Sequence, residues 1–283
     1  MQARRIEEKL FLGLMTLALL AVLASLIGVV AVVLVKGLPA LTLEMVTQLP
    51  RGGYYLGKSG GVLNAIVGSL LLAVSATALA LLLSMPLVSY LQKEYGGKSR
   101  LADLTRLSLD VMWGVPSIVY GAFGFAVMLY LGMRASLLGG IMALTLVELP
   151  IMARAIHEIV KMVPADLKEA SYALGATRLE TVFKVVWRHA LPGVFTAVLL
   201  AFGRGIGDAA AVLFTAGYTD YIPRSPTEPV ASLPLAVFFQ IGTPFQKVQE
   251  RAYACAAILL AIVLALSLAS RLLARKWEAD IAR

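Results

Sequence analysis

Six long apolar stretches constrain this chain more than any other feature, and four of them contain no charged residue. Only 15% of the 283 residues are charged, against roughly 25% in a soluble domain. A membrane-spanning helix needs about 20 mostly apolar residues, and these stretches are too long and too unalternating for barrel strands. We therefore predict an all-α membrane protein with six transmembrane helices, within 9–36, 58–93, 110–134, 135–159, 191–217 and 251–271.

Basic residues are spread unequally over the connections between these stretches. If the N-terminus is cytoplasmic, 17 of the 25 Lys and Arg residues lie in cytoplasmic segments, 7 in outer segments, and Arg204 lies inside a span. Because Lys and Arg accumulate on the cytoplasmic side, we expect both termini there. The net charge of +8 then reflects topology, and we expect no nucleic-acid partner.

The same pattern predicts a division of the chain into three parts. Residues 1–62 hold the first transmembrane helix and an outer loop, and residues 63–274 form a five-helix permease core. The core includes a long cytoplasmic loop at 154–190 and an outer loop at 218–250, and long loops often carry function. Residues 275–283 form a cytoplasmic tail. The first apolar stretch is too long for the hydrophobic region of a signal peptide, so we expect it to span the membrane.

Several function classes find no support in the sequence. Cys255 is the single cysteine, and His157 and His189 lack metal-ligand spacing. We therefore expect no catalytic residue, no metal site and no cofactor bound by this chain. The sequence also lacks a Gly-x-x-x-x-Gly-Lys-Ser/Thr loop, so ATP has to be bound elsewhere.

The cytoplasmic loop predicts a short amphipathic helix followed by a tight turn. Pro164 suits the first helical turn, Asp166 suits the helix dipole, and Gly175 is a natural stop. A second helix is expected at 178–189, with Pro192 opening the next span. By these residues alone, a helix lying at the lipid headgroups and a helix that docks onto a partner are equally supported.

The same segment resembles the EAA loop of bacterial ABC importer permeases. In that family the loop is the coupling helix, which docks into a groove on the ATPase subunit. The sequence departs from the family where Trp187 and Arg188 stand in the Leu-Pro places. The resemblance implies an ABC type I importer permease fold and an ATPase-coupling role for Glu169, Ala170, Ser171 and Gly175.

Two charged residues interrupt the fifth apolar stretch. Arg204 in a span costs roughly 2.5 kcal/mol or more unless it faces a partner or water, and its guanidinium matches phosphate oxygens. Asp208 follows four residues later, which is the spacing of one helix face. The pair either joins helices or belongs to a substrate pathway, and glycines at 203, 205 and 207 allow a neighbour or an ion to come close.

Segments 114–121 and 203–210 resemble those of phosphate importer permeases, the PstA and PstC pair, and 231–234 is more PstA-like. The family usually has Glu and Thr where Asp208 and Ala209 stand. Similar permeases also carry an arginine at Arg154, which an ordinary interfacial residue would equally explain. The resemblance thus suggests a substrate pathway containing Arg204, Asp208 and Arg154.

The resemblance implies a multi-pass protein of the bacterial inner membrane that moves inorganic phosphate into the cytoplasm by alternating access. Its expected partners are a second permease (PstC-like), ATPase subunits (PstB-like) that use ATP and Mg, and an external phosphate-binding protein (PstS-like). Three alternatives remain: an ABC permease for sulfate or molybdate, an ATPase-independent channel or carrier, and a membrane-embedded enzyme. The absence of a cluster of His, Cys or carboxylate residues from the sequence argues against the membrane-embedded enzyme.

Overall fold

The computed structural model describes residues 2–53, 59–92, 96 and 99–281. The basic residues Lys58, Lys93, Lys98 and Arg283, which entered the orientation argument, lie outside this part of the chain. The described residues form helices and loops without a β-strand. The elements are α1 (Gln2–Gly37), η1 (Leu38–Ala40), α2 (Leu43–Thr47), α3 (Leu63–Tyr90), α4 (Arg100–Gly114), α5 (Ser117–Tyr130), α6 (Leu137–Lys161), α7 (Ala165–Ala173), α8 (Arg178–Glu180), η3 (Thr181–Val186), α9 (Trp187–Ile206), α10 (Leu233–Ile241) and α11 (Gln246–Ile281).

The prediction of an all-α membrane protein is confirmed. Among the described residues, five helical segments are long and apolar enough to cross a membrane, and a sixth crossing results if α4 and α5 count as one bent span. The five segments are Glu7–Ala40, Leu63–Tyr90, Leu137–Lys161, Arg178–Ile206 and Gln246–Ala269.

The third predicted span is broken rather than straight. Helices α4 and α5 meet at an angle of 104°, and the break falls at Val115 and Pro116, which have ψ angles of 127° and 139°. Proline disfavours the helical conformation in the residue before it and has no N–H for the helix ladder. The elbow therefore lies at Pro116.

The fifth predicted span differs from expectation at both ends. Helix α9 continues directly from α8 and η3, so the expected loop helix at 178–189 and the span form one helical segment. Pro192 lies inside this helix and does not open it. At the other end α9 stops at Ile206, and residues 207–217 continue as turns and loop. Our prediction that Asp208 lies on the same helix as Arg204 was therefore wrong.

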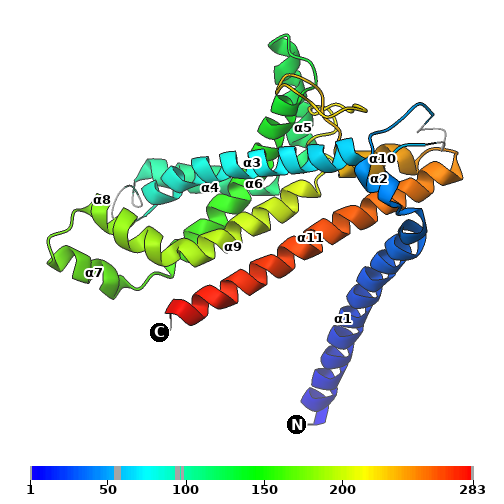
Figure 1. The fold of residues 1–283 in the computed structure, drawn as a ribbon. Coiled ribbons are helices and arrows are strands. Elements are labelled where there is room, and N and C mark those ends of the chain that lie inside the picture. Colours follow the sequence, from blue (N-terminus) through cyan, green and yellow to red (C-terminus); the bar gives the residue numbers. More distant parts are fainter. Residues whose placement is uncertain (1, 54–58, 93–95, 97–98, 282–283) are drawn as a thin grey trace.

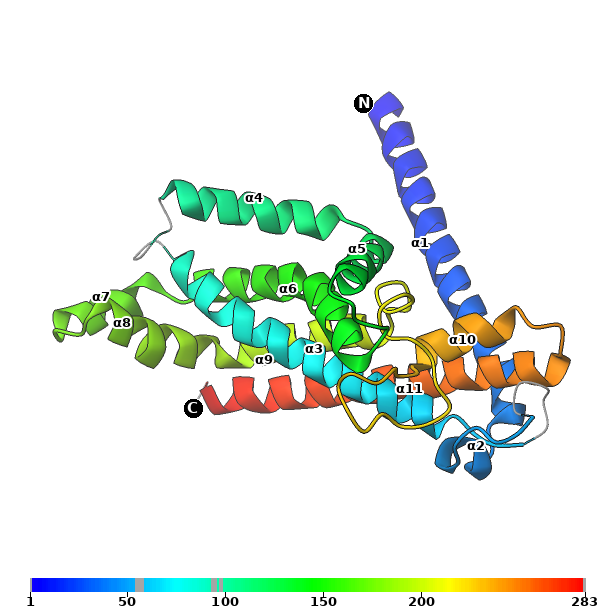
Figure 2. The same ribbon diagram turned by 90° about the horizontal axis from the view of Figure 1, so that it is seen from above.

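Helix α6 is the centre of the bundle, because α3, α9, α5 and α4 all pack against it. Its fully buried side chains include Leu144, Met152 and Ile156. Helices α7 and α8 lie at one end of the bundle, and α2 and α10 lie at the other (Figure 1). Both views show α1 diverging from the bundle (Figures 1 and 2). Helix α1 and the η1 turn that follows it contact the bundle at α11.

Candidate functional site

Helix α7 carries the residues expected to couple to an ATPase, and it lies at one end of the bundle (Figure 1). No residue of α7 is buried, and Glu169, Ala170 and Gly175 are exposed. Leu174, at its end, leaves 90% of its surface exposed. These residues are therefore accessible to a partner, and their ATPase-coupling role stays a prediction.

Helix α7 ends in a Schellman motif. Gly175 adopts a φ of 80°, and its N–H donates to the carbonyl of Tyr172 at 2.9 Å. The N–H of Ala176 donates to the carbonyl of Ser171 at 3.1 Å, which completes the two bonds of the motif. Gly175 is thus the stop that the sequence indicated, and its positive φ explains why a glycine suits this position.

The chain then turns back into the bundle through a second capped helix. The side chain of Thr177 accepts from the N–H of Glu180, and the Glu180 carboxylate accepts from the N–H of Thr177 at 3.0 Å. This capping box satisfies two of the free donors at a helix start.

Trp187, farther along the same helical segment, is buried and donates from Nε1 to the Ser89 hydroxyl of α3 at 3.0 Å. The unusual Trp187 thus anchors the helical segment against α3.

Arg204 and Asp208 are brought together, but not as a buried ion pair. The Arg204 Nη2 atom lies 4.0 Å from Asp208 Oδ2, and the side chains are 59% and 5% exposed. Asp208 also accepts from the N–H of Ala211 at 2.9 Å through Oδ1. The carboxylate therefore caps the turn that follows α9, while the guanidinium is left largely uncovered by other residues.

The Arg204 cavity, of about 470 Å³, lies at the elbow between α4 and α5. Arg204 is its one charged lining residue among the described residues. Tyr120 also lines it, although its hydroxyl donates to the carbonyl of Met112 at 2.8 Å. The remaining lining residues are Met112, Trp113, Val115, Ser117, Val147, Pro150, Ile151 and Leu200. A positive charge in a largely apolar cavity attracts an anion more strongly than it does in water.

Arg154 does not line this cavity, although it lies beside one of the residues that do. Its Nη2 atom lies 2.9 Å from Asp110 Oδ1 on α4, and its guanidinium is 5.9 Å from the centre of the Trp113 ring. Since Trp113 lines the cavity, Arg154 and Arg204 approach it from α6 and α9. Of the three residues of the predicted pathway, Arg204 lines this cavity, Arg154 lies beside its wall residue Trp113, and Asp208 lines a separate small pocket.

Glu148 is a fully buried carboxylate behind Arg204. Its Oε2 atom accepts from the Thr77 hydroxyl of α3 at 2.8 Å, whereas Oε1 has no hydrogen-bond partner within the described residues. A Cβ atom at Gly205 would overlap Oε1. Gly205 therefore lets Glu148 pack against α9, whereas a Cβ at Gly203 would meet nothing within 4 Å. Of the glycines at 203, 205 and 207, Gly205 is thus the one whose missing side chain lets another helix come close.

Sequence reasoning missed Asp110, Trp113 and Thr77 as neighbours of the site. Asp110 marks the edge of an apolar stretch, and an acidic residue near the membrane indicates a basic partner. The neighbouring sequence does not identify which basic residue that partner is. Thr77 carried no signal, because a threonine within an apolar helix usually bonds its own backbone.

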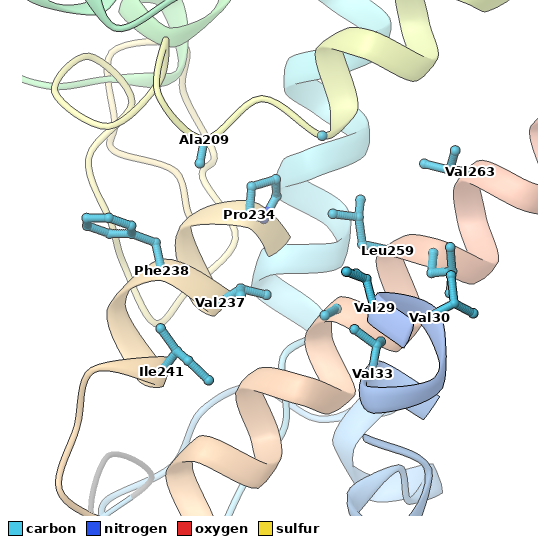
Figure 3. Close-up of a pocket in the computed structure, with 13 residues that line it drawn as sticks. Val29, Val30, Val33, Ala209, Pro234, Val237, Phe238, Ile241, Leu259 and Val263 are labelled. Carbon is cyan, nitrogen blue, oxygen red and sulfur yellow. The ribbon is translucent and has the colours of Figure 1, made fainter. Parts of the chain in front are cut away.

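A pocket of about 600 Å³ lies between α1, α10 and α11 (Figure 3). Its walls are apolar side chains such as Val33, Phe238 and Leu259, and none of the described residues that line it is charged. It therefore suits a hydrocarbon chain rather than an anion, and it is set apart from the Arg204 cavity.

Known proteins resemble the chain in sequence and in fold. The family model of the binding-protein-dependent transport system inner membrane component matches residues 85–279. The phosphate transport system permease protein PstA of Haemophilus influenzae is 32% identical over 269 residues, which cover 95% of this chain and 94% of that protein. PstA 1 of Mycobacterium tuberculosis is 35% identical over 217 residues, covering 76% and 71%.

Among solved structures, a chain of the MetNI methionine ABC transporter matches with a TM-score of 0.64 at 18% identity, covering 76% of this chain and 95% of that chain. A chain of a bacterial ABC transporter that imports alginate matches with a TM-score of 0.54 at 13% identity, covering 90% and 95%. The fold is thus that of ABC importer permeases. With its multiple apolar spans, the chain is a multi-pass inner-membrane protein that belongs to the binding-protein-dependent transport system inner membrane component family.

Proposed function

We propose that this chain is the permease subunit of an ABC importer that moves inorganic phosphate into the cytoplasm. The observation that carries the proposal is Arg204, a largely exposed arginine in the cavity at the α4–α5 elbow. Guanidinium groups bind phosphate oxygens through paired donors. The identification of phosphate as the substrate comes from the PstA relatives, which are named as phosphate transport system permease proteins.

In this proposal Asp208 holds Arg204 weakly between transport events. A separation of 4.0 Å is long for a charge-assisted hydrogen bond, which is usually 2.7–2.9 Å. An anion entering the cavity therefore competes with Asp208 for the guanidinium at little cost. Arg154, which joins α6 to α4 through its pair with Asp110, is the second guanidinium beside the path.

Energy for transport comes from a partner, because the sequence has no P-loop. Helix α7, with Glu169, Ala170, Ser171 and Gly175, docks onto an ATPase subunit that uses ATP and Mg. ATP-driven closure of the ATPases moves α7, and the bundle alternates between outward and inward access. The complete transporter contains a PstC-like second permease, PstB-like ATPases and a PstS-like phosphate-binding protein.

The orientation of the proposed subunit places both termini and the 154–190 loop in the cytoplasm. The outer loop at 218–250 then faces the binding protein. Residues 1–62 form the N-terminal part, residues 63–274 the core, and residues 275–283 the cytoplasmic tail. Cysteine substitutions at Glu169 and Arg224, labelled with an impermeant maleimide in right-side-out vesicles, test this topology. Labelling of the residue 169 cysteine without permeabilisation contradicts it.

Uptake by the reconstituted transporter tests the function. We expect ATP-dependent accumulation of labelled phosphate that excess sulfate and molybdate leave unchanged. Arg204→Gln should abolish uptake while the complex still assembles, because the cavity loses its charge. Arg134→Gln, which alters an exposed arginine in the loop between α5 and α6, is the matched control and should transport normally. Normal uptake by Arg204→Gln, or strong competition by sulfate, rules out this assignment.

A further inference from the structure

A second cavity, of about 630 Å³, lies beside α7 at the tip of the bundle. Within the part of the chain that the structure describes, it shares no lining residue with the Arg204 cavity. Residues from the end of α3, from α4, from α6 and from α7 meet around it. The polar and charged lining residues are Gln92, Arg106, His157, Lys161 and Lys168.

The charge of this α7 cavity is positive. Arg106, Lys161 and Lys168 are cationic at neutral pH, and no acidic residue lines the cavity in the described part of the chain. Asp103 and Glu158 do pair with Arg106 and Lys161, at 2.8 and 2.9 Å. Both are pairs between neighbouring turns with exposed partners, and such pairs contribute little. A ligand with more negative charge replaces them readily.

The start of α7 adds to this positive potential. Ala165, its first residue, lines the cavity, and Pro164 before it provides no side-chain cap. The uncapped N–H groups and the dipole of a helix start favour anions. Asp166 in the same turn is exposed and does not line the cavity. The helix start and the basic side chains therefore act in the same direction.

Basic residues near a membrane surface usually serve topology alone, each extending singly into water. Here three cations from three helices line one cavity. Arg106 is also oriented by a bond from Nη2 to the carbonyl of Leu91 at 3.3 Å. Topology requires the charges to lie on one side of the membrane, but it does not require them to converge.

We propose that the α7 cavity binds a phosphate-group anion, either free inorganic phosphate or the headgroup phosphate of an anionic phospholipid. The bound anion links α7 to α4 and α6 through Lys168, Arg106 and Lys161. Since α7 is the coupling helix of the proposed function, occupancy restrains the element that moves in the transport cycle. Only this last consequence rests on the proposed function, whereas the binding site itself does not.

Binding of labelled inorganic phosphate to the assembled transporter, without nucleotide or binding protein, is the first test. The complex carries Arg204→Gln, which removes binding at the other cavity, and it is held in phosphatidylcholine nanodiscs. Lys161→Gln should weaken binding about tenfold or more, because a charge-assisted contact is lost. Lys161→Arg should retain it. Lys184→Gln is the matched control, since Lys184 is an exposed lysine paired with Glu180 at 3.0 Å and does not line the cavity.

Lipid retention is the second test and separates the two ligand sources. Nanodiscs containing phosphatidylglycerol are analysed by native mass spectrometry, and we expect retained phosphatidylglycerol to fall in Lys161→Gln but not in Lys184→Gln. Phosphate binding that depends on Lys161 supports a free anion, and lipid retention that depends on Lys161 supports a headgroup. If neither ligand distinguishes Lys161→Gln from Lys184→Gln, the site does not exist.

Hydrogen exchange then tests the link to α7. The backbone amides of residues 165–175 should exchange more slowly when the ligand is present, and this protection should vanish in Lys161→Gln. Protection that persists in this variant overturns the link. These readouts are independent of uptake, so a transporter that fails to move phosphate refutes the proposed function without affecting the α7 cavity.

Discussion

Replacement of Gly205 by alanine tests the packing of Glu148 against α9. The new Cβ would overlap Glu148 Oε1 and lie close to Cδ of the same side chain, so the carboxylate has to move away. It then loses the 2.8 Å hydrogen bond from the Thr77 hydroxyl, and a buried hydrogen bond of this kind contributes about 0.5–1.5 kcal/mol. Overpacking itself costs about 1–3 kcal/mol. Against this, alanine gains about 1 kcal/mol in helix preference.

The matched control is Gly203→Ala in the same helix, where a Cβ meets nothing within 4 Å. This variant gains the helix preference without the overlap, so its melting temperature should equal or exceed that of the unaltered protein. Gly205→Ala should melt several degrees lower, since about 1 kcal/mol corresponds to about 2–4 °C for a chain of this size. Thermal unfolding of the purified transporter in nanodiscs measures both.

A double substitution decides whether Glu148 is the cause. Glu148→Ala removes the overlapping carboxylate, so the combination with Gly205→Ala should be more stable than the two single effects predict, by about 0.5–3 kcal/mol. Equal melting of Gly205→Ala and Gly203→Ala, or strict additivity in the double variant, would refute the reasoning.

Two further substitutions test local features of the site. Gly175→Ala forces a side chain into a φ of 80° in open space and should cost about 1–2 kcal/mol, measured as a lower melting temperature. Gly242→Ala, equally open but at a φ of −83°, should change little, and equal effects would contradict the backbone argument. Asp110→Asn breaks the pair with Arg154, whose side chains are 52% and 49% exposed, and should cost at most about 1 kcal/mol. A drop of many degrees in its melting temperature would mean that the pair holds α4 against α6.

The sequence was informative about local features of the candidate site. The Schellman stop at Gly175 and the break at Pro116 follow from backbone conformation, which one or two residues largely decide. The departure at Trp187 and Arg188 had no local explanation. Trp187 is explained by its bond to Ser89 on another helix, and no sequence rule connects two such distant residues.

The sequence by itself determined that the chain crosses a membrane repeatedly as helices, because lipid demands long apolar segments with internally satisfied backbones. It also singled out Arg204 and Arg154, since charge is costly in that setting. Only the tertiary structure decided that α9 ends before Asp208, that Arg154 pairs with Asp110, and that Glu148 packs against Gly205. The physical reason is that periodicity and charge act along one helix, whereas these contacts depend on how separate helices pack.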